Sequence, residues 1–166
     1  MSGAFNTLRE GVAGQLKRAG LNAVAAMGPG RAARWREPVV AVTLKKVTCA
    51  PGGFQDYLGL RRDPDSGREQ EVYGREAELT LALDVFAPGD GGEGPGLELA
   101  EAVAEELACR GAAGLPALEL ETGRTEFLEG AGLYRVQVSC RCRAWLVAAA
   151  DGGGGFVDFE VKGRVR

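Results

Sequence analysis

The sequence predicts an α+β domain in which a mainly antiparallel sheet is packed on one face by two helices. Three observations predict this class. Two segments repeat apolar residues at helical spacing, several others alternate apolar and polar residues as half-buried strands do, and Gly-rich turns join the later strands. Alternation favours antiparallel pairing, because parallel strands are covered on both faces and are apolar throughout.

The N-terminal helix is expected over residues 5–19, where apolar residues recur at three- and four-residue steps. Ser2 or Asn6 can cap its start, and Gly20 ends it. A second helix is expected over residues 96–110, which carry an apolar stripe of the same spacing.

The expected strands cover residues 39–48, 78–88, 118–128, 134–146 and 156–165. The first begins with consecutive apolar residues and is expected to be covered on both faces there. The second and fourth alternate regularly, which is typical of a sheet with one buried face. The resulting order is helix, strand, long loop, strand, helix and three strands.

Two segments are predicted to be loops. Residues 50–74 are rich in Gly, Pro and charge, and an irregular segment of that length in a small domain is usually functional or mobile. Residues 88–96 form a shorter acidic, Gly-rich loop. With 166 residues, 45% of them apolar, the chain 1–166 has the size and composition of a single domain.

The sequence also indicates where the protein resides. No apolar run approaches the roughly 18 residues that a membrane span needs. The N-terminus lacks the charged, apolar and small-residue regions of a signal peptide, so we expect a cytoplasmic protein.

The four cysteines do not have the spacing of a metal site. Cys140 and Cys142 share one face of an expected strand, where cysteine usually serves as a small apolar residue. A structural role is the main interpretation of these two and of Cys49 and Cys109, and a disulfide or a metal site is the alternative.

The composition argues against catalysis. The chain has no histidine, which excludes Ser-His and Cys-His nucleophiles and the commonest general base. The remaining candidates are carboxylates on one strand and one helix, namely Asp158, Glu160, Glu101, Glu105 and Glu106. Such groups are mostly solvated, so we expect no catalytic residues, no cofactor and no metal.

Residues 89–94, GDGGEG, match the letters of the dinucleotide-binding motif GxGxxG between a strand and a helix. The charge of the segment contradicts that interpretation. Asp90, Glu93 and Glu98 would repel a pyrophosphate at the helix N-terminus, and Pro95 lacks a backbone donor. A flexible acidic loop is the better interpretation.

Basic residues project from one side of the last two long strands, at Arg135, Arg141, Arg143, Lys162 and Arg164. If these strands pair as a hairpin, the five charges form an electropositive face toward nucleic acid or an acidic partner. The alternative is a solvated face on which Asp158 and Glu160 neutralise them.

The order of elements, together with the stretches PVVAV (38–42), ELTLALDVFAP (78–88) and GLYRVQV (132–138), resembles a known family. Residues 5–148 resemble the tail terminator and tail-completion proteins of long-tailed bacteriophages and prophages. The chain departs from the family pattern by a longer segment at 20–37, a longer loop at 50–74 and an extra strand after Asp151.

The resemblance implies a homo-oligomer, a hexameric ring that caps the tail tube, stops its polymerisation and offers a docking face to the head connector. It implies assembly in the host cytoplasm and a place in the virion tail or neck, with no cofactor and no small-molecule substrate. A neck or other tail-associated subunit fits the sequence equally well.

A closed ring needs two different complementary patches on each subunit. We assign one to the aromatic and basic residues of the long loop, Phe54, Tyr57, Leu58, Arg61, Arg62 and Tyr73. The other is a sheet face or edge, and the basic face would line a channel through which DNA passes. Two other classes stay open, a small-ligand or regulatory binding module and an enzyme that uses carboxylates alone.

Overall fold

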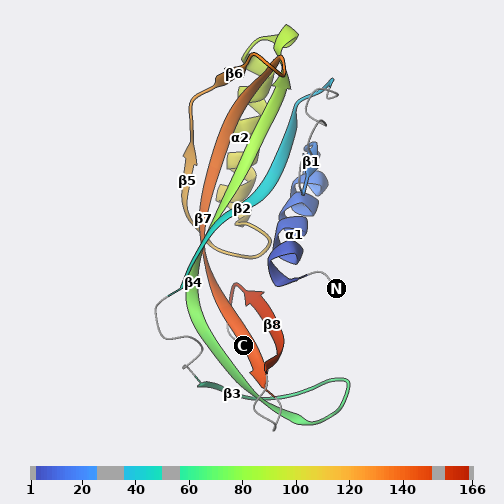
Figure 1. The fold of residues 1–166 in the computed structure, drawn as a ribbon, viewed down its shortest axis with the longest axis vertical. Coiled ribbons are helices and arrows are strands. Elements are labelled where there is room, and N and C mark those ends of the chain that lie inside the picture. The colour runs from blue at the N-terminus through green and yellow to red at the C-terminus, as the bar shows by residue number, and fades with distance from the viewer. Residues whose placement is uncertain (1–2, 26–35, 50–56, 151–155, 165–166) are drawn as a thin grey trace.

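The computed structural model describes residues 3–25, 36–49, 57–150 and 156–164 (Figure 1). In chain order the elements are α1 (Ala4–Arg18), β1 (Ala23–Val24), β2 (Val39–Cys49), β3 (Tyr57–Arg62), β4 (Glu69–Pro88), the short 3-10 helix η2 (Gly89–Gly91), α2 (Gly94–Arg110), β5 (Ala117–Thr122), β6 (Glu126–Leu128), β7 (Leu133–Ala150) and β8 (Phe156–Lys162).

The long strands β4 and β7 form the centre of the sheet. They pair antiparallel without interruption, from Glu71 opposite Ala150 to Pro88 opposite Leu133. On its other side β4 pairs with β2 over one part of its length and with β3 over another. On its other side β7 pairs in the same way with β6, β5 and β8 at successive positions along the strand. Only the short β1 pairs parallel, with β2, among the described strands. The sheet is therefore mainly antiparallel.

Both helices pack on one face of this sheet, as Figure 1 shows. α1 buries its apolar stripe there, and α2 buries a stripe of the same kind beside it. The sheet supplies alternate residues of β4 and β7, so the core consists of Leu8, Val12, Leu16, Ala100, Val103, Leu107, Leu79, Leu81, Leu83, Val85, Val136, Val138, Cys140, Cys142 and Ala144, among others. The predicted α+β class is confirmed.

Gln15 on α1 joins the two helices. Its side-chain amide donates to the carbonyl of Gly111 at 2.9 Å, and its carbonyl accepts from the amide of Ala113 at 2.8 Å. The loop that follows α2 is thus held against α1. The predicted cap Asn6 is wrong, because Gly3 precedes the helix and Asn6 instead accepts from Arg9. Ser2 lies outside the described residues.

The prediction that residues 50–74 form one irregular loop is wrong over its described part. β3 and the first residues of β4 make a hairpin there, with Tyr57 opposite Tyr73 and Arg62 opposite Glu69. The segment has no apolar alternation, and β4 is a strand here because it pairs with β3 on one side and β7 on the other. Residues 50–56 lie outside the described part.

One end of the sheet extends beyond the helices, and we call it the arm. It consists of β3, residues 69–76 of β4, residues 145–150 of β7, and β8 (Figure 1). The beginning of α1 reaches it, at β8. We call the helix-covered remainder the body. No helix in the described part of the chain is both long and apolar enough to cross a membrane.

Candidate interaction surfaces

An aromatic row crosses the arm on the side that faces α1. Tyr57 on β3 meets Tyr73 on β4 edge to face, with ring centroids 5.6 Å apart. Tyr73 lies opposite Ala148 on β7, and Ala148 lies opposite Phe159 on β8. Phe159 in turn contacts Phe5 at the start of α1, with ring centroids 5.8 Å apart. The sheet register therefore aligns aromatic side chains from distant parts of the sequence.

This row is open to solvent. Tyr57 is 54% exposed, and Leu60, two strand positions beyond the row, is 59% exposed. Phe5 and Phe159 are also exposed in part. Large apolar groups that lie together on a surface indicate a contact with another molecule. Leu60, Phe5 and Phe159 are absent from the predicted patch. The sequence does not show that neighbouring elements leave their apolar side chains uncovered.

Leu58 differs from its neighbours in the predicted patch. Its side chain points to the other face of the arm, where a Cβ on Gly74 would meet Leu58 Cδ1 at 2.5 Å and Val147 Cγ2 at 3.4 Å. Leu58 therefore holds β3 on the sheet, while Tyr57 and Leu60 face outward. Phe54 lies outside the described residues.

The two arginines of the predicted patch act within the arm. Arg61 on β3 donates to Glu160 on β8 at 3.2 Å, and Glu160 also pairs with Lys162 at 2.9 Å. These contacts cross four strands on the face opposite the aromatic row. Arg62 donates to the carbonyl of Gly67 at 2.9 Å and so holds the β3–β4 turn.

Tyr73 has a polar contact as well as its ring contact. Its hydroxyl donates to Glu71 Oε2 at 2.7 Å on the same strand. This hydrogen bond to a carboxylate raises the pKa of Tyr73 above 10, because ionisation would remove the proton that is shared.

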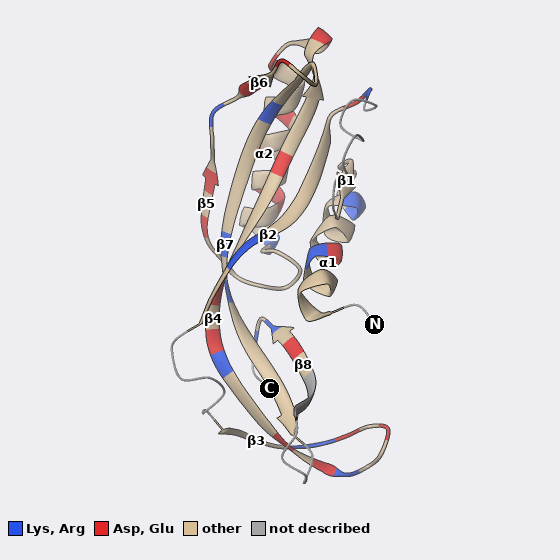
Figure 2. Cartoon of the chain, viewed as in Figure 1, with Lys and Arg blue, Asp and Glu red and all other residues tan. Residues whose placement is uncertain are grey.

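The three arginines of β7 alternate with its buried core residues, so they lie on the sheet face away from the helices, and each pairs with a carboxylate. Figure 2 shows blue positions on β7 and red positions on β4 beside it. Arg135 pairs with Asp84 at 3.3 Å, and Arg143 with Glu76 at 2.7 Å. Arg141 pairs with both Glu78 and Glu119, at 2.9 and 2.8 Å. The carboxylates come from β4 and β5, not from β8 as the sequence-based alternative supposed.

The five predicted basic residues do not form one patch. Lys162 lies opposite Trp145, and Arg135 is ten residues further along β7, which corresponds to roughly 33 Å of strand. Arg164 follows β8 and is exposed. The arginines on this face of β7 are neutralised by carboxylates. The passage of DNA was predicted from free positive charge on this face, and it stays a prediction.

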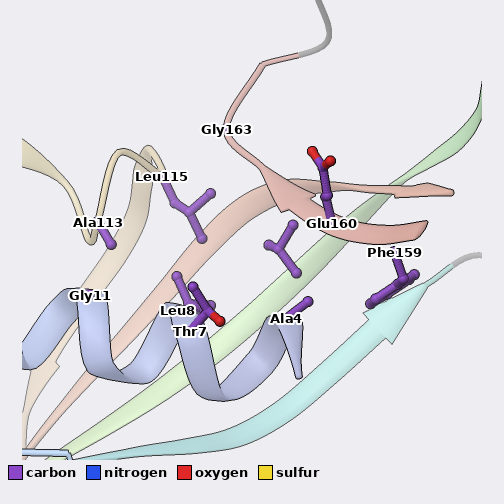
Figure 3. Close-up of a pocket in the computed structure, with 10 residues that line it drawn as sticks. Ala4, Thr7, Leu8, Gly11, Ala113, Leu115, Phe159, Glu160 and Gly163 are labelled. Atoms are coloured by element: carbon purple, nitrogen blue, oxygen red, sulfur yellow. The ribbon is translucent and has the colours of Figure 1, made fainter. Parts of the chain in front are cut away.

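A groove of about 470 Å³ lies between the start of α1, the loop 111–115 and β8 (Figure 3). Leu8, Leu115, Phe159 and Val161 give it an apolar lining. Its polar side chains already have partners, since Thr7 donates to the carbonyl of Gly3 and Glu160 pairs with Arg61 and Lys162. The groove continues the apolar surface of the aromatic row through Phe159.

The GDGGEG segment is compact. Gly89 donates its amide to the carbonyl of Gly132 at 2.9 Å, so this amide does not point toward a ligand. A Cβ on Gly89 would lie 2.8 Å from that carbonyl oxygen and 2.9 Å from Phe127, which explains the glycine by packing. Glu93 precedes the first turn of α2, where it opposes anion binding.

The cysteines are all free thiols. Cys140 and Cys142 are buried in the core with their sulfur atoms 3.5 Å apart, as the structural interpretation requires. Their mutual hydrogen bond and their burial raise the pKa of Cys142, so it stays a neutral thiol. Cys49 and Cys109 are exposed.

Comparison of the chain with protein-family models finds no match, and comparison with curated proteins finds none either.

Proposed function

We propose that this chain is a structural subunit of a phage or prophage tail, which forms a ring, caps the tail tube and joins it to the head connector. It would assemble in the host cytoplasm and remain in the virion tail or neck. The proposal comes from the order of elements and the sequence stretches that resemble tail terminators, and the α+β fold is compatible with it.

The arm is the observation that carries the proposal. It extends the sheet beyond the helices and presents Tyr57, Leu60 and Phe159 on an open face. Exposed apolar side chains that lie together mark a contact with another molecule, and a subunit that overlaps its neighbours needs such a surface. Another neck or tail-associated subunit would use the same arm.

The two other classes find less support. A ligand-binding module needs an apolar pocket with a few convergent polar groups, and the polar side chains of the groove are engaged elsewhere. A carboxylate enzyme needs two carboxylates that converge in a cleft, whereas the described lining of the groove has Glu160 as its one carboxylate, and Glu160 pairs with Arg61 and Lys162.

The proposal predicts that a gene for a tail-tube protein lies near the gene for this chain, and the product of that gene is the partner for the test. We expect the purified chain to form rings in electron micrographs, alone or on the tubes, and to stop tube growth at one end. Tubes of unchanged length with no density at their ends, together with a monomeric mass by light scattering, would refute the proposed function.

The arm is tested separately by Tyr57→Ser with Leu60→Ser, which removes exposed apolar surface and leaves Leu58 in place. We expect weaker ring formation from a subunit with an unchanged circular dichroism spectrum. Arg68→Ser with Glu69→Ser, at the turn end of the same hairpin, is the matched control and should assemble normally. Equal assembly by both variants would remove the arm from the proposal.

A further inference from the structure

The charges of the chain are separated along the sequence. Residues 1–49 contain eight basic and two acidic residues, a net charge of +6, whereas residues 88–130 contain ten acidic and two basic residues, a net charge of −8. The overall charge of −3 conceals this separation. Charges of opposite sign within one chain matter only if the fold keeps them apart.

The sheet topology does keep them apart. The strand order in the body is β1-β2-β4-β7-β5, so the basic segment supplies one edge and the acidic segment supplies the other. α1 packs over the β1–β2 edge, and α2 packs over β7, β4 and β5. Figure 2 shows red acidic positions along α2, β5 and β6, and blue positions on α1 and β2.

We call the first of these surfaces the acidic edge. It contains Glu98 and Glu101 on α2 and Glu121 on β5, all exposed, and no ion pair joins them to other described residues. Leu97 and Leu118 are exposed on the same two elements. An apolar centre with a charged rim is the usual composition of a protein interface.

The basic edge lies on the opposite side of the sheet. Lys45 and Lys46 on β2 are exposed, and neither has an ion pair with another described residue. β1 covers β2 only at Val40 and Ala41, so the part of β2 that carries the lysines is open. Lys17 near the end of α1 adds a further exposed charge.

Neither edge is suited to strand pairing with another copy. The β2 ladder is interrupted between Leu44 and Lys46, and the β5 ladder between Ala117 and Glu119. Bulges and charged side chains protect edge strands against such pairing. Contact between these edges must therefore go through side chains.

We propose that the acidic edge of one copy binds the basic edge of the next copy around the ring. This inference rests on the proposed function and identifies the surfaces that meet. The occupant is a second copy because the complementary charge is on the opposite edge of the same sheet. A contact between two different edges repeats head to tail, and such a contact forms a ring when the rotation between successive copies closes.

The test uses two charge-reversed variants. Lys45→Glu with Lys46→Glu makes both edges acidic, and Glu101→Lys with Glu121→Lys replaces acid by base on the other edge. Each variant alone is expected to associate at least about tenfold more weakly than the unaltered chain, because like charges repel each other. Mixed in equal amounts, the two variants should assemble again.

Asp65→Lys with Glu69→Lys is the control, because it changes net charge as much as the second variant but lies in the β3–β4 turn and at the first residue of β4, away from both edges. Circular dichroism tests whether each variant is folded, and light scattering measures its mass in solution. Carbodiimide joins carboxylates to lysines in contact, and a mixture of isotope-labelled and unlabelled chain identifies the products between copies.

The outcomes separate the two proposals. The edge contact is overturned, and the proposed function stands, if the unaltered chain forms rings that charge reversal leaves intact. The same conclusion follows if the variants are folded but fail to assemble when mixed. A chain that neither scatters as an oligomer, nor cross-links between copies, nor caps tubes overturns both. Cross-links between Lys45 or Lys46 and Glu101 or Glu121 support the edge contact.

Discussion

At the scale of single residues, close backbone approaches in the loop after α2 set the position of one wall of the groove. Gly111 ends α2 with φ +71° and donates its amide to the carbonyl of Leu107. A Cβ on Gly111 would overlap the carbonyl oxygen of Leu115, whereas Gly114, with φ +82°, has open space around it. Both glycines have a positive φ, but only Gly111 has a backbone atom where a Cβ would lie, so a comparison of the two distinguishes backbone strain from steric overlap.

Gly111→Ala should therefore destabilise the protein more than Gly114→Ala. Both substitutions place alanine at a positive φ, which costs about 1 kcal/mol. Only Gly111→Ala adds an overlap between backbone atoms, with a further cost of about 1–3 kcal/mol. Urea denaturation measures the two free energies of unfolding, and equal values would contradict the assigned overlap.

The Tyr73–Glu71 hydrogen bond gives a prediction for pH. Because the pKa of Tyr73 is raised in the folded protein, the bond stabilises the arm fully below pH 10 and is lost as the pH rises through the folded pKa. Nuclear magnetic resonance titration of the Tyr73 ring should give a pKa above 10, and Glu71→Gln should lower it. Tyr57 is the internal comparison, and no change on substitution would rule out the bond.

At the scale of elements, β3 depends on contacts from other strands. Leu58 packs near Gly74 and Val147, and Arg61 reaches Glu160 on β8. Leu60 lies on the same strand and is mostly exposed. Neighbouring residues of one short strand thus have different roles, one in folding and the other at the surface.

Leu58→Ser should loosen the arm, whereas Leu60→Ser should not. Removal of the Leu58 side chain takes away the apolar contact that holds β3 on β4, while Leu60 loses only exposed area. Hydrogen exchange of the amides of residues 57–62 and 69–75 should accelerate in the first variant alone. Equal exchange in the two variants would show that Leu58 does not hold the strand.

At the scale of the whole molecule, the two central strands, β4 and β7, run through both the body and the arm. In the body, β4 is covered by α2, and in the arm it has strands on both sides but little helix cover. Because β4 is paired on both sides along most of its length, differences in its stability come from packing and not from hydrogen bonding.

Exchange should therefore differ along β4. Amides of residues 79–85 are expected to exchange on the order of tenfold or more slowly than those of residues 70–75, because local opening of the arm leaves the core intact. Mass spectrometry of peptic peptides measures this gradient in the free chain. Uniform protection along β4 would mean that arm and body unfold together.

Much of the body could be predicted from the sequence. Alternation in residues 79–85 and 134–146, together with the helical stripes, identified most core residues, because burial on one face imposes a period on the sequence. The absence of histidine excluded several catalytic classes on composition alone. These inferences are local, since each depends on the residue types present or on the neighbours of a residue along the chain.

The arm and the charged surfaces could not be predicted in that way. Residues 69–76 have no apolar alternation and become a strand through pairing with β3 and with residues 145–150. The partners of Arg141 are 63 and 22 residues away in the sequence, so the neutralisation of this face follows from strand register.

Composition and periodicity were enough to establish the fold class, most of the core and the separation of basic from acidic segments, because these are properties of residues that are close together along the chain. The alignment of aromatic residues across the arm, and the placement of opposite charges on opposite edges of one sheet, emerged only when the chain was folded. Both depend on the order and register of strands, and these are set by contacts between segments that are far apart in the chain.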